Sequence, residues 1–140
     1  MDNKRAHLKM IQGVINRLAD NSFRLKYWSV ILVSALFALA ATNTKMVYIY
    51  LAYIPAISFW ILDGYYLWQE GLFRDLYDDV RKKNESEIDF SMTASEVAGE
   101  ENTWLNAFFS KTIILFHGFI VLAVVVVMIL GILLDMDKLV

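Results

Sequence analysis

The sequence contains no cysteine, and only one proline, two histidines and six glycines in 140 residues. Without cysteine the chain forms no disulfide and offers no thiolate metal ligand or cysteine nucleophile. The two histidines lie in different segments, and no Gly-rich phosphate loop, Ser-His-Asp set or paired catalytic carboxylates are visible. We therefore expect no enzyme, no cofactor and no metal site.

A large excess of charge of one sign is also missing. Thirteen Lys and Arg oppose fifteen Asp and Glu, for a net charge of -2, which argues against nucleic acid as a partner. What the chain has in abundance is apolar surface, since 58% of its residues are hydrophobic and its mean hydropathy is +0.46. A soluble fold of this length would not bury so much. The expected partner is a lipid bilayer, and the lack of cysteine fits a bacterial inner membrane.

Three apolar runs are long enough to cross a bilayer. Residues 112–134 carry no Asp, Glu, Lys or Arg and would span roughly 35 Å as a helix. Residues 27–44 and 46–68 are the other two, and 27–44 is short, at about 27 Å. The turn between them, 42–45, has room only for a tight helical hairpin. The fold class predicted is an all-α integral membrane protein with a transmembrane hairpin, a separate third span and amphipathic cytoplasmic helices.

The distribution of charge predicts the topology. Residues 1–26 contain six Lys or Arg and two Asp, and such an excess beside a first span is typical of a cytoplasmic N-terminus. The hairpin then lies outside and residues 69–103 lie inside. The third crossing places the tail, 135–140 with Asp135, Asp137 and Lys138, on the outside.

Two amphipathic helices are expected at the cytoplasmic surface. In 1–26 the stripe steps by three or four residues, and 69–83 continues the second span with a similar stripe. We expect the two helices to pack together, within one chain or between subunits, while a first helix lying flat on anionic lipid is the alternative. The stripe residues are Leu8, Ile11, Ile15 and Leu18 in the first helix, and Phe73, Leu76 and Val80 in the second.

Residues 84–103 have a different composition, with six acidic residues and no basic ones. Such a segment buries little apolar surface and is expected to be a mobile linker or a short surface helix. An acidic docking strip for a basic partner is the alternative. Residues 104–134 then combine an aromatic interfacial approach with the third span.

Ionisable groups inside the apolar runs are costly in lipid and face protein or water. Asp63 lies near the inner end of the second span, and two interpretations are open: an interfacial residue paired with a cytoplasmic Lys or Arg, or a residue that lines or gates a pore. His117 is either a hydrogen-bonded interfacial residue or part of a proton relay.

Small residues recur every fourth position in the first span at Ser34, Ala38 and Thr42. This spacing favours close approach of another helix and hence a homo-oligomer, although ordinary small residues in a short span would give the same pattern. Three spans with one or two polar groups are unlike a complete transporter core, so self-association is the natural way to build a larger structure.

The order of a basic cytoplasmic helix, a tight two-span hairpin and an emerging charged helix resembles the SLATT group of small bacterial membrane effectors. The resemblance covers about residues 5–83, from the segment around 17–26 to the segment 60–81, and the third span departs from the two-span plan. It implies a pore-forming or membrane-disrupting effector in phage defence, released by a sensor partner or a nucleotide signal.

Two functions follow as hypotheses. The first is a self-associating inner-membrane effector that permeabilises its own membrane when triggered. The alternative is a non-enzymatic membrane anchor or accessory subunit that docks a separately encoded protein.

Overall fold

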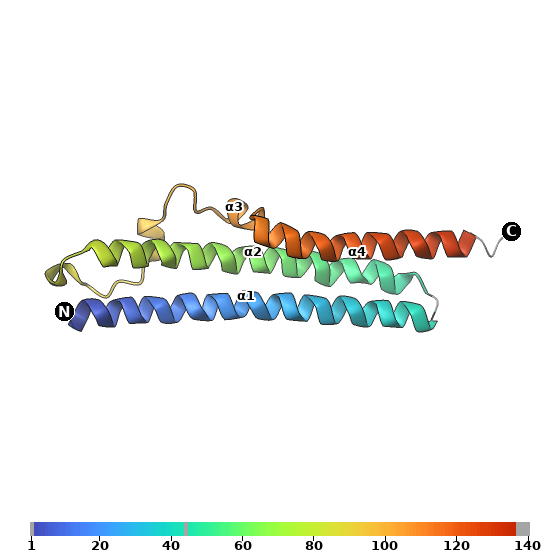
Figure 1. Ribbon diagram of the computed structural model, residues 1–140, viewed down its shortest axis with the longest axis horizontal. Coiled ribbons are helices and arrows are strands. Elements are labelled where there is room, and N and C mark those ends of the chain that lie inside the picture. Colours follow the sequence, from blue (N-terminus) through green and yellow to red (C-terminus); the bar gives the residue numbers. More distant parts are fainter. Residues whose placement is uncertain (1, 44, 137–140) are drawn as a thin grey trace.

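The computed structural model describes residues 2–43 and 45–136, and every regular element within them is a helix. Three long helices run side by side, with α2 between α1 and α4 (Figure 1). The first turn of α1 and the last turn of α2 lie at one end, and the hairpin and the end of α4 lie at the other. The elements are α1 (Asp2–Asn43), α2 (Val47–Lys82), η1 (Glu85–Glu87), η2 (Ala94–Val97), α3 (Trp104–Phe108) and α4 (Lys111–Met136).

The first helix is continuous across the boundary at residue 26 that the sequence analysis placed between two elements. Gly13 is its one glycine, and no proline lies within it, so neither of the two strongest helix breakers interrupts it after that position. At about 1.5 Å per residue its 42 residues reach roughly 63 Å, twice the thickness of a hydrocarbon core. A straight helix that crosses a bilayer with one half cannot lie flat on it with the other, so the alternative of a flat N-terminal helix would require a bend in α1.

The second helix likewise combines the expected span and its extension in 36 residues. It continues through Pro55, although a proline removes one backbone hydrogen bond of a helix. Three helices, within α1, α2 and α4, are long and apolar enough to span a membrane. The predicted all-α fold with three such helices is confirmed to that extent.

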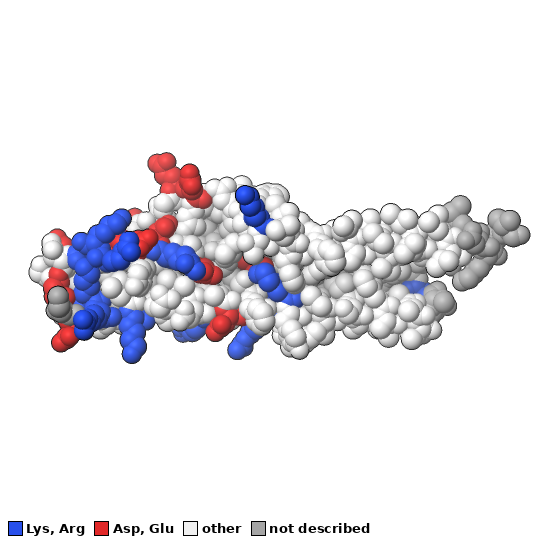
Figure 2. Space-filling model, viewed as in Figure 1, with Lys and Arg blue, Asp and Glu red and all other residues white. Residues whose placement is uncertain are grey.

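Charged side chains gather in one half of the molecule, which we call the charged half (Figure 2). It contains α1 up to residue 26, α2 from residue 64 and the connection to α3. Its core joins Ile11 and Ile15 of α1 to Leu72, Leu76 and Val80 of α2. The apolar half has a second core, formed by Val33 of α1, Ile49, Ala52 and Ala56 of α2, and Ile120 and Val124 of α4.

Residues 84–103, which we call the strap, lie across the charged half. The sequence analysis expected this segment to bury little, but Ala94 is buried, and Ile88, Met92 and Val97 pack against the core of the charged half. Four apolar side chains spaced along an acidic segment are enough to hold it on the two helices. Of the predicted tail, residues 137–140 lie outside the described residues.

Candidate functional site: a buried polar junction of three helices

Asp63 occupies the boundary between the charged half and the apolar half. It lies on α2 about 25 Å from the hairpin end of that helix, as judged from the helical rise. Its side chain is fully buried, and so is that of His117 on α4. A buried carboxylate at this depth requires partners, because its charge is poorly solvated by protein or lipid.

Asp63 has partners on both of the other long helices. Lys26 Nζ of α1 lies 2.5 Å from Asp63 Oδ2, and His117 Nε2 of α4 lies 2.9 Å from the same oxygen. Ser22 Oγ, one turn before Lys26, donates to Asp63 Oδ1 at 2.5 Å. Lys26 Nζ also donates to Ser22 Oγ at 2.8 Å. We call Ser22, Lys26, Asp63 and His117 the polar junction.

An aromatic stack covers the junction on the side of α3. The ring of Trp60 is nearly parallel to His117 at 6.0 Å between centroids and to Phe108 at 5.3 Å. Trp60 Nε1 donates to the backbone oxygen of Phe108 at 3.3 Å. Gly64, next to Asp63, allows this approach, because a Cβ there would lie 3.2 Å from Phe108 Cα. The short helix α3 is therefore packed directly against the part of α2 that carries Asp63.

Two polar atoms beside the junction are buried without a hydrogen-bond partner among the described residues: His117 Nδ1 and Ser29 Oγ. Such atoms are uncommon in folded proteins because each loses its hydration without compensation. Lys26, in contrast, retains a side-chain exposure of 20%, so the junction reaches solvent or headgroups through the lysine. Chemically, the junction holds one shared carboxylate, one permanent cation and one imidazole that can change charge.

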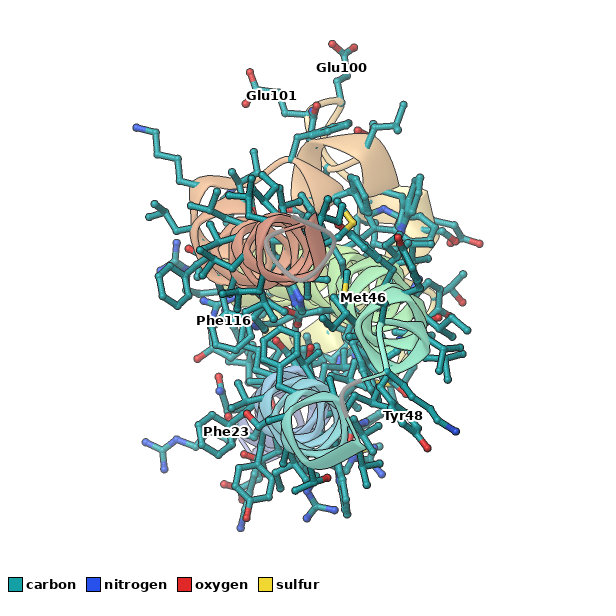
Figure 3. All side chains as sticks on the ribbon, turned by 90° about the vertical axis from the view of Figure 1, so that its right-hand side faces the viewer. Phe23, Met46, Tyr48, Glu100, Glu101 and Phe116 are labelled. Atoms are coloured by element: carbon teal, nitrogen blue, oxygen red, sulfur yellow. The ribbon has the colours of Figure 1, made fainter. Side chains whose placement is uncertain are left out.

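The predicted packing face on α1 is not buried inside the chain. Ser34, Ala38 and Thr42 are exposed, and Ser34 lines an apolar groove of about 370 Å³ between α1 and α4. Figure 3 shows Phe116 of α4 on the side that faces this groove. Other small residues pack inside the chain: Ala52 and Ala56 of α2 have no exposed surface, and Ala40 of α1 packs against the same core.

The residues predicted at the cytoplasmic surface lie together on α1 and α2. Ile11, Ile15, Leu76 and Val80 are buried in one core, and Leu8 and Phe73 pack against it. Leu18 is half-buried.

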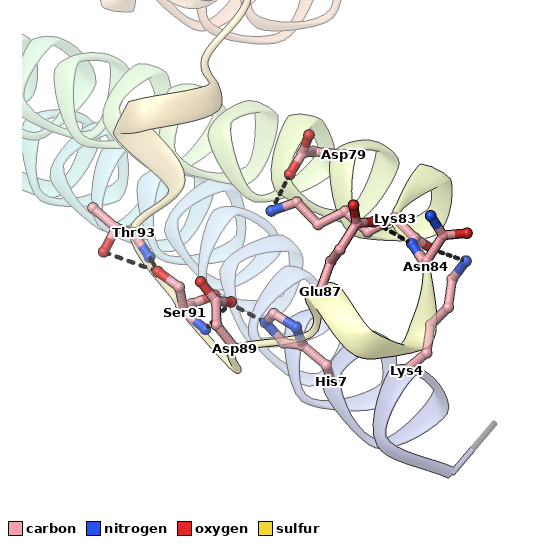
Figure 4. Close-up of polar contacts among 9 residues, drawn as sticks. All are labelled: Lys4, His7, Asp79, Lys83, Asn84, Glu87, Asp89, Ser91 and Thr93. Carbon is pink, nitrogen blue, oxygen red and sulfur yellow. Dashed lines mark hydrogen bonds and ion pairs between the residues drawn. The ribbon is translucent and has the colours of Figure 1, made fainter.

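The strap is tied to both helices by polar contacts (Figure 4). His7 is buried and its Nε2 lies 2.9 Å from the backbone oxygen of Ser91, while Lys4 Nζ donates to the backbone oxygen of Lys83 at 2.7 Å. The N–H of Ser91 donates to Asp89 and lowers the pKa of that carboxyl below its usual value. The hydrogen bond from Lys83 to Asp79 raises the pKa of the lysine.

Sequence reasoning identified Asp63 and His117 separately but did not pair them, and it gave no role to Ser22 or Lys26. A signal for both was present. The stripe that begins at Leu8 continues every three or four residues to Val33, and its polar members are Ser22, Lys26 and Ser29. A lysine within such a seam predicts a buried acidic partner.

Comparison with protein-family models, curated proteins and solved structures finds no significant match for this chain. The interpretation of the site therefore depends on the geometry of the junction itself.

Proposed function

We propose that this protein is a multi-pass protein of the bacterial inner membrane that self-associates and permeabilises that membrane when triggered. The observation that carries the proposal is the buried polar junction. A carboxylate, an ammonium and an imidazole are held between three helices at the edge of the apolar half, where an isolated anchor would need none of them. When the helices separate, these groups become available to line a water-filled path.

Two features of the apolar half support the self-association. The groove between α1 and α4 leaves part of both helices without a protein neighbour, and Ser34, Ala38 and Thr42 lie on the exposed surface of α1. The charged half, with its many Lys and Arg, is assigned to the cytoplasm by the positive-inside rule. The resemblance to the SLATT group is the reason for assigning the trigger to phage defence.

The test is induced expression in a bacterial host that carries a membrane-potential dye. Wild-type protein is expected to depolarise the membrane and arrest growth, with any partner encoded beside it co-expressed. Asp63→Asn removes the charge of the junction and is expected to change the extent of depolarisation at equal protein levels. Asp78→Asn is the matched control, because Asp78 is an exposed residue of the same helix. Unchanged potential and growth for the wild type, with its partner present, would contradict the proposal.

The alternative, a membrane anchor or accessory subunit, is favoured by one observation. The strap is packed on the charged half, yet Glu96, Glu100 and Glu101 are exposed, and Figure 3 shows Glu100 and Glu101 directed away from the bundle. Such a surface suits a basic partner protein. Loss of a co-purifying partner on changing these three residues to Gln, with membrane potential unaffected throughout, would favour the anchor.

A further inference from the structure

The polar junction contains one carboxylate oxygen that is shared by two nitrogens from different helices. Lys26 Nζ and His117 Nε2 both lie within hydrogen-bond distance of Asp63 Oδ2. Because the carboxylate accepts, Nε2 of His117 carries a hydrogen, and in the neutral imidazole Nδ1 then holds a lone pair. Nδ1 is buried and has no hydrogen-bond partner among the described residues. With a neutral imidazole the junction carries no net charge, and Nδ1 is a free proton-accepting position inside it.

We propose that His117 is a proton-binding site and that proton uptake there releases Lys26 from Asp63. A proton added at Nδ1 raises the charge of the junction from zero to +1. The buried site tolerates an excess charge poorly, so one of the two cations leaves. His117 has no exposed surface, whereas Lys26 is partly exposed and its long chain can carry the ammonium towards headgroups or water. The neutral pair that remains is Asp63 with protonated His117.

The exchange moves a contact from one pair of helices to another. When His117 is neutral, Asp63 of α2 forms its ion pair with Lys26 of α1. When His117 is protonated, Asp63 forms its ion pair with His117 of α4 instead. The other groups that face His117 carry no charge: Trp60 of α2 stacks on its ring, and Phe108 of α3 stacks on Trp60. Lys26 is therefore the cation that opposes protonation of His117, and Asp63 is the anion that favours it. This inference does not depend on the proposed permeabilisation.

The test uses the full chain in lipid nanodiscs with isotope-labelled histidine. The ring resonances of His7 and His117 are followed from pH 8 to pH 4 and assigned with His7→Gln. Replacing Lys26 by Met removes a cation that shares an oxygen with His117, and a neighbouring like charge typically shifts a titration by about 1 to 3 pH units. The midpoint of the His117 titration is therefore expected to rise by about that amount. Arg24→Met, which removes an exposed cation of α1 at nearly the same depth, is expected to leave the midpoint unchanged.

A second measurement follows the lysine itself. Labelling by an amine-reactive probe is quantified at Lys26 relative to exposed Lys9, which corrects for the pH dependence of the reaction. Relative labelling of Lys26 is expected to increase several-fold below the midpoint of His117 and to become independent of pH in His117→Gln. Circular dichroism shows whether a variant has kept its helices. If Lys26→Met has lost them, Lys26→Gln is used in its place. A midpoint that Lys26→Met and Lys26→Gln leave unchanged, or labelling of Lys26 that ignores the state of His117, would overturn the proposal.

Discussion

At the scale of single residues, the carboxylate of Asp63 on α2 contacts side chains from both of the other long helices. Its charge is balanced by Lys26 and His117, and removing a buried partner leaves the others with an uncompensated desolvation cost. The stability of the fold and the chemistry of the junction therefore depend on the same side chain.

Replacing Asp63 by Asn is expected to destabilise the protein by about 3 kcal/mol, because Lys26 and the buried His117 lose their anion. This loss is at the low end of the range for breaking a buried ion pair, because Lys26 is partly exposed. Thermal unfolding in detergent, followed by circular dichroism, measures the change. Asp78→Asn breaks an exposed pair with Arg81 and is expected to cost less than about 1 kcal/mol. Equal losses for the two variants would mean that the junction contributes no special stability.

Two helical glycines make a matched comparison. Gly13→Ala adds a methyl group with nothing within 4 Å, so the better helix propensity of alanine is expected to stabilise the protein by up to about 1 kcal/mol. Gly64→Ala places a Cβ 3.2 Å from the backbone of Phe108, which must move, and is expected to cost about 1 to 3 kcal/mol. The same unfolding experiment decides the signs, and stabilisation by both would show that α3 is not held against α2.

At the scale of elements, the apolar pattern predicted which faces of α1 and α2 meet in the charged half. Leu8, Ile11 and Ile15 recur at helical spacing, and the structure places them in or against one core. The pattern could not show that the helices continue unbroken from the charged half into the apolar half, because the change from an amphipathic to an apolar sequence looks the same with or without a break. The acidic composition of the strap likewise did not indicate that four of its apolar side chains pack in or against the core of the charged half.

The strap is held near its end by Asp75. Its Oδ2 accepts from the N–H of Gly99 at 2.9 Å and from Asn102 Nδ2 at 3.0 Å. Asp75→Ala removes both bonds at a cost of roughly 1 to 2 kcal/mol, so local opening is expected to become about ten-fold more frequent. Cleavage by a Glu-specific protease after Glu96 and Glu100 measures this opening. Asp78→Ala, one turn away and ion-paired with Arg81 of the same helix, is expected to leave the cleavage rate unchanged; acceleration by both would point to a general loosening of α2 instead.

At the scale of the whole molecule, the structure separates a charged half from an apolar half, while the orientation deduced from the distribution of Lys and Arg stays a prediction. Cysteine is absent from the natural sequence, so single cysteines can be introduced without background. Ser95→Cys on the strap is expected to react with a membrane-impermeant thiol reagent only after lysis. Lys45→Cys in the hairpin is expected to react with the same reagent in intact spheroplasts. Labelling of position 95 in intact cells would invert the proposed orientation.

Small residues at four-residue spacing occur on two of the long helices. The internal contact uses Ala52 and Ala56 of α2, which follow the same four-residue spacing as the predicted set on α1. The pattern alone cannot distinguish a face that packs within a chain from one that packs between chains, because both need only a close approach of backbones. Ser34, Ala38 and Thr42 are exposed in the single chain, so contact between copies through this face stays a prediction.

Assembly of copies through this face predicts the effect of one enlarged side chain. Ala38→Leu adds three carbons at an exposed position of α1, so the protomer itself has space for them, while a close contact between helices of two copies would lose about 1 to 3 kcal/mol. The oligomer is expected to shift towards monomer by roughly ten-fold or more in the dissociation constant. Ala35→Leu makes the identical change at an exposed position about 60° around the helix from Ala38, at the border of the predicted face, and is expected to weaken assembly less than Ala38→Leu. Light scattering of the purified protein in detergent measures the mass of each species. Dissociation by Ala35→Leu but not by Ala38→Leu would move the contact around α1 towards the flank that carries Ala35, whereas an unchanged mass for both would assign assembly to the groove between α1 and α4 or to the charged half.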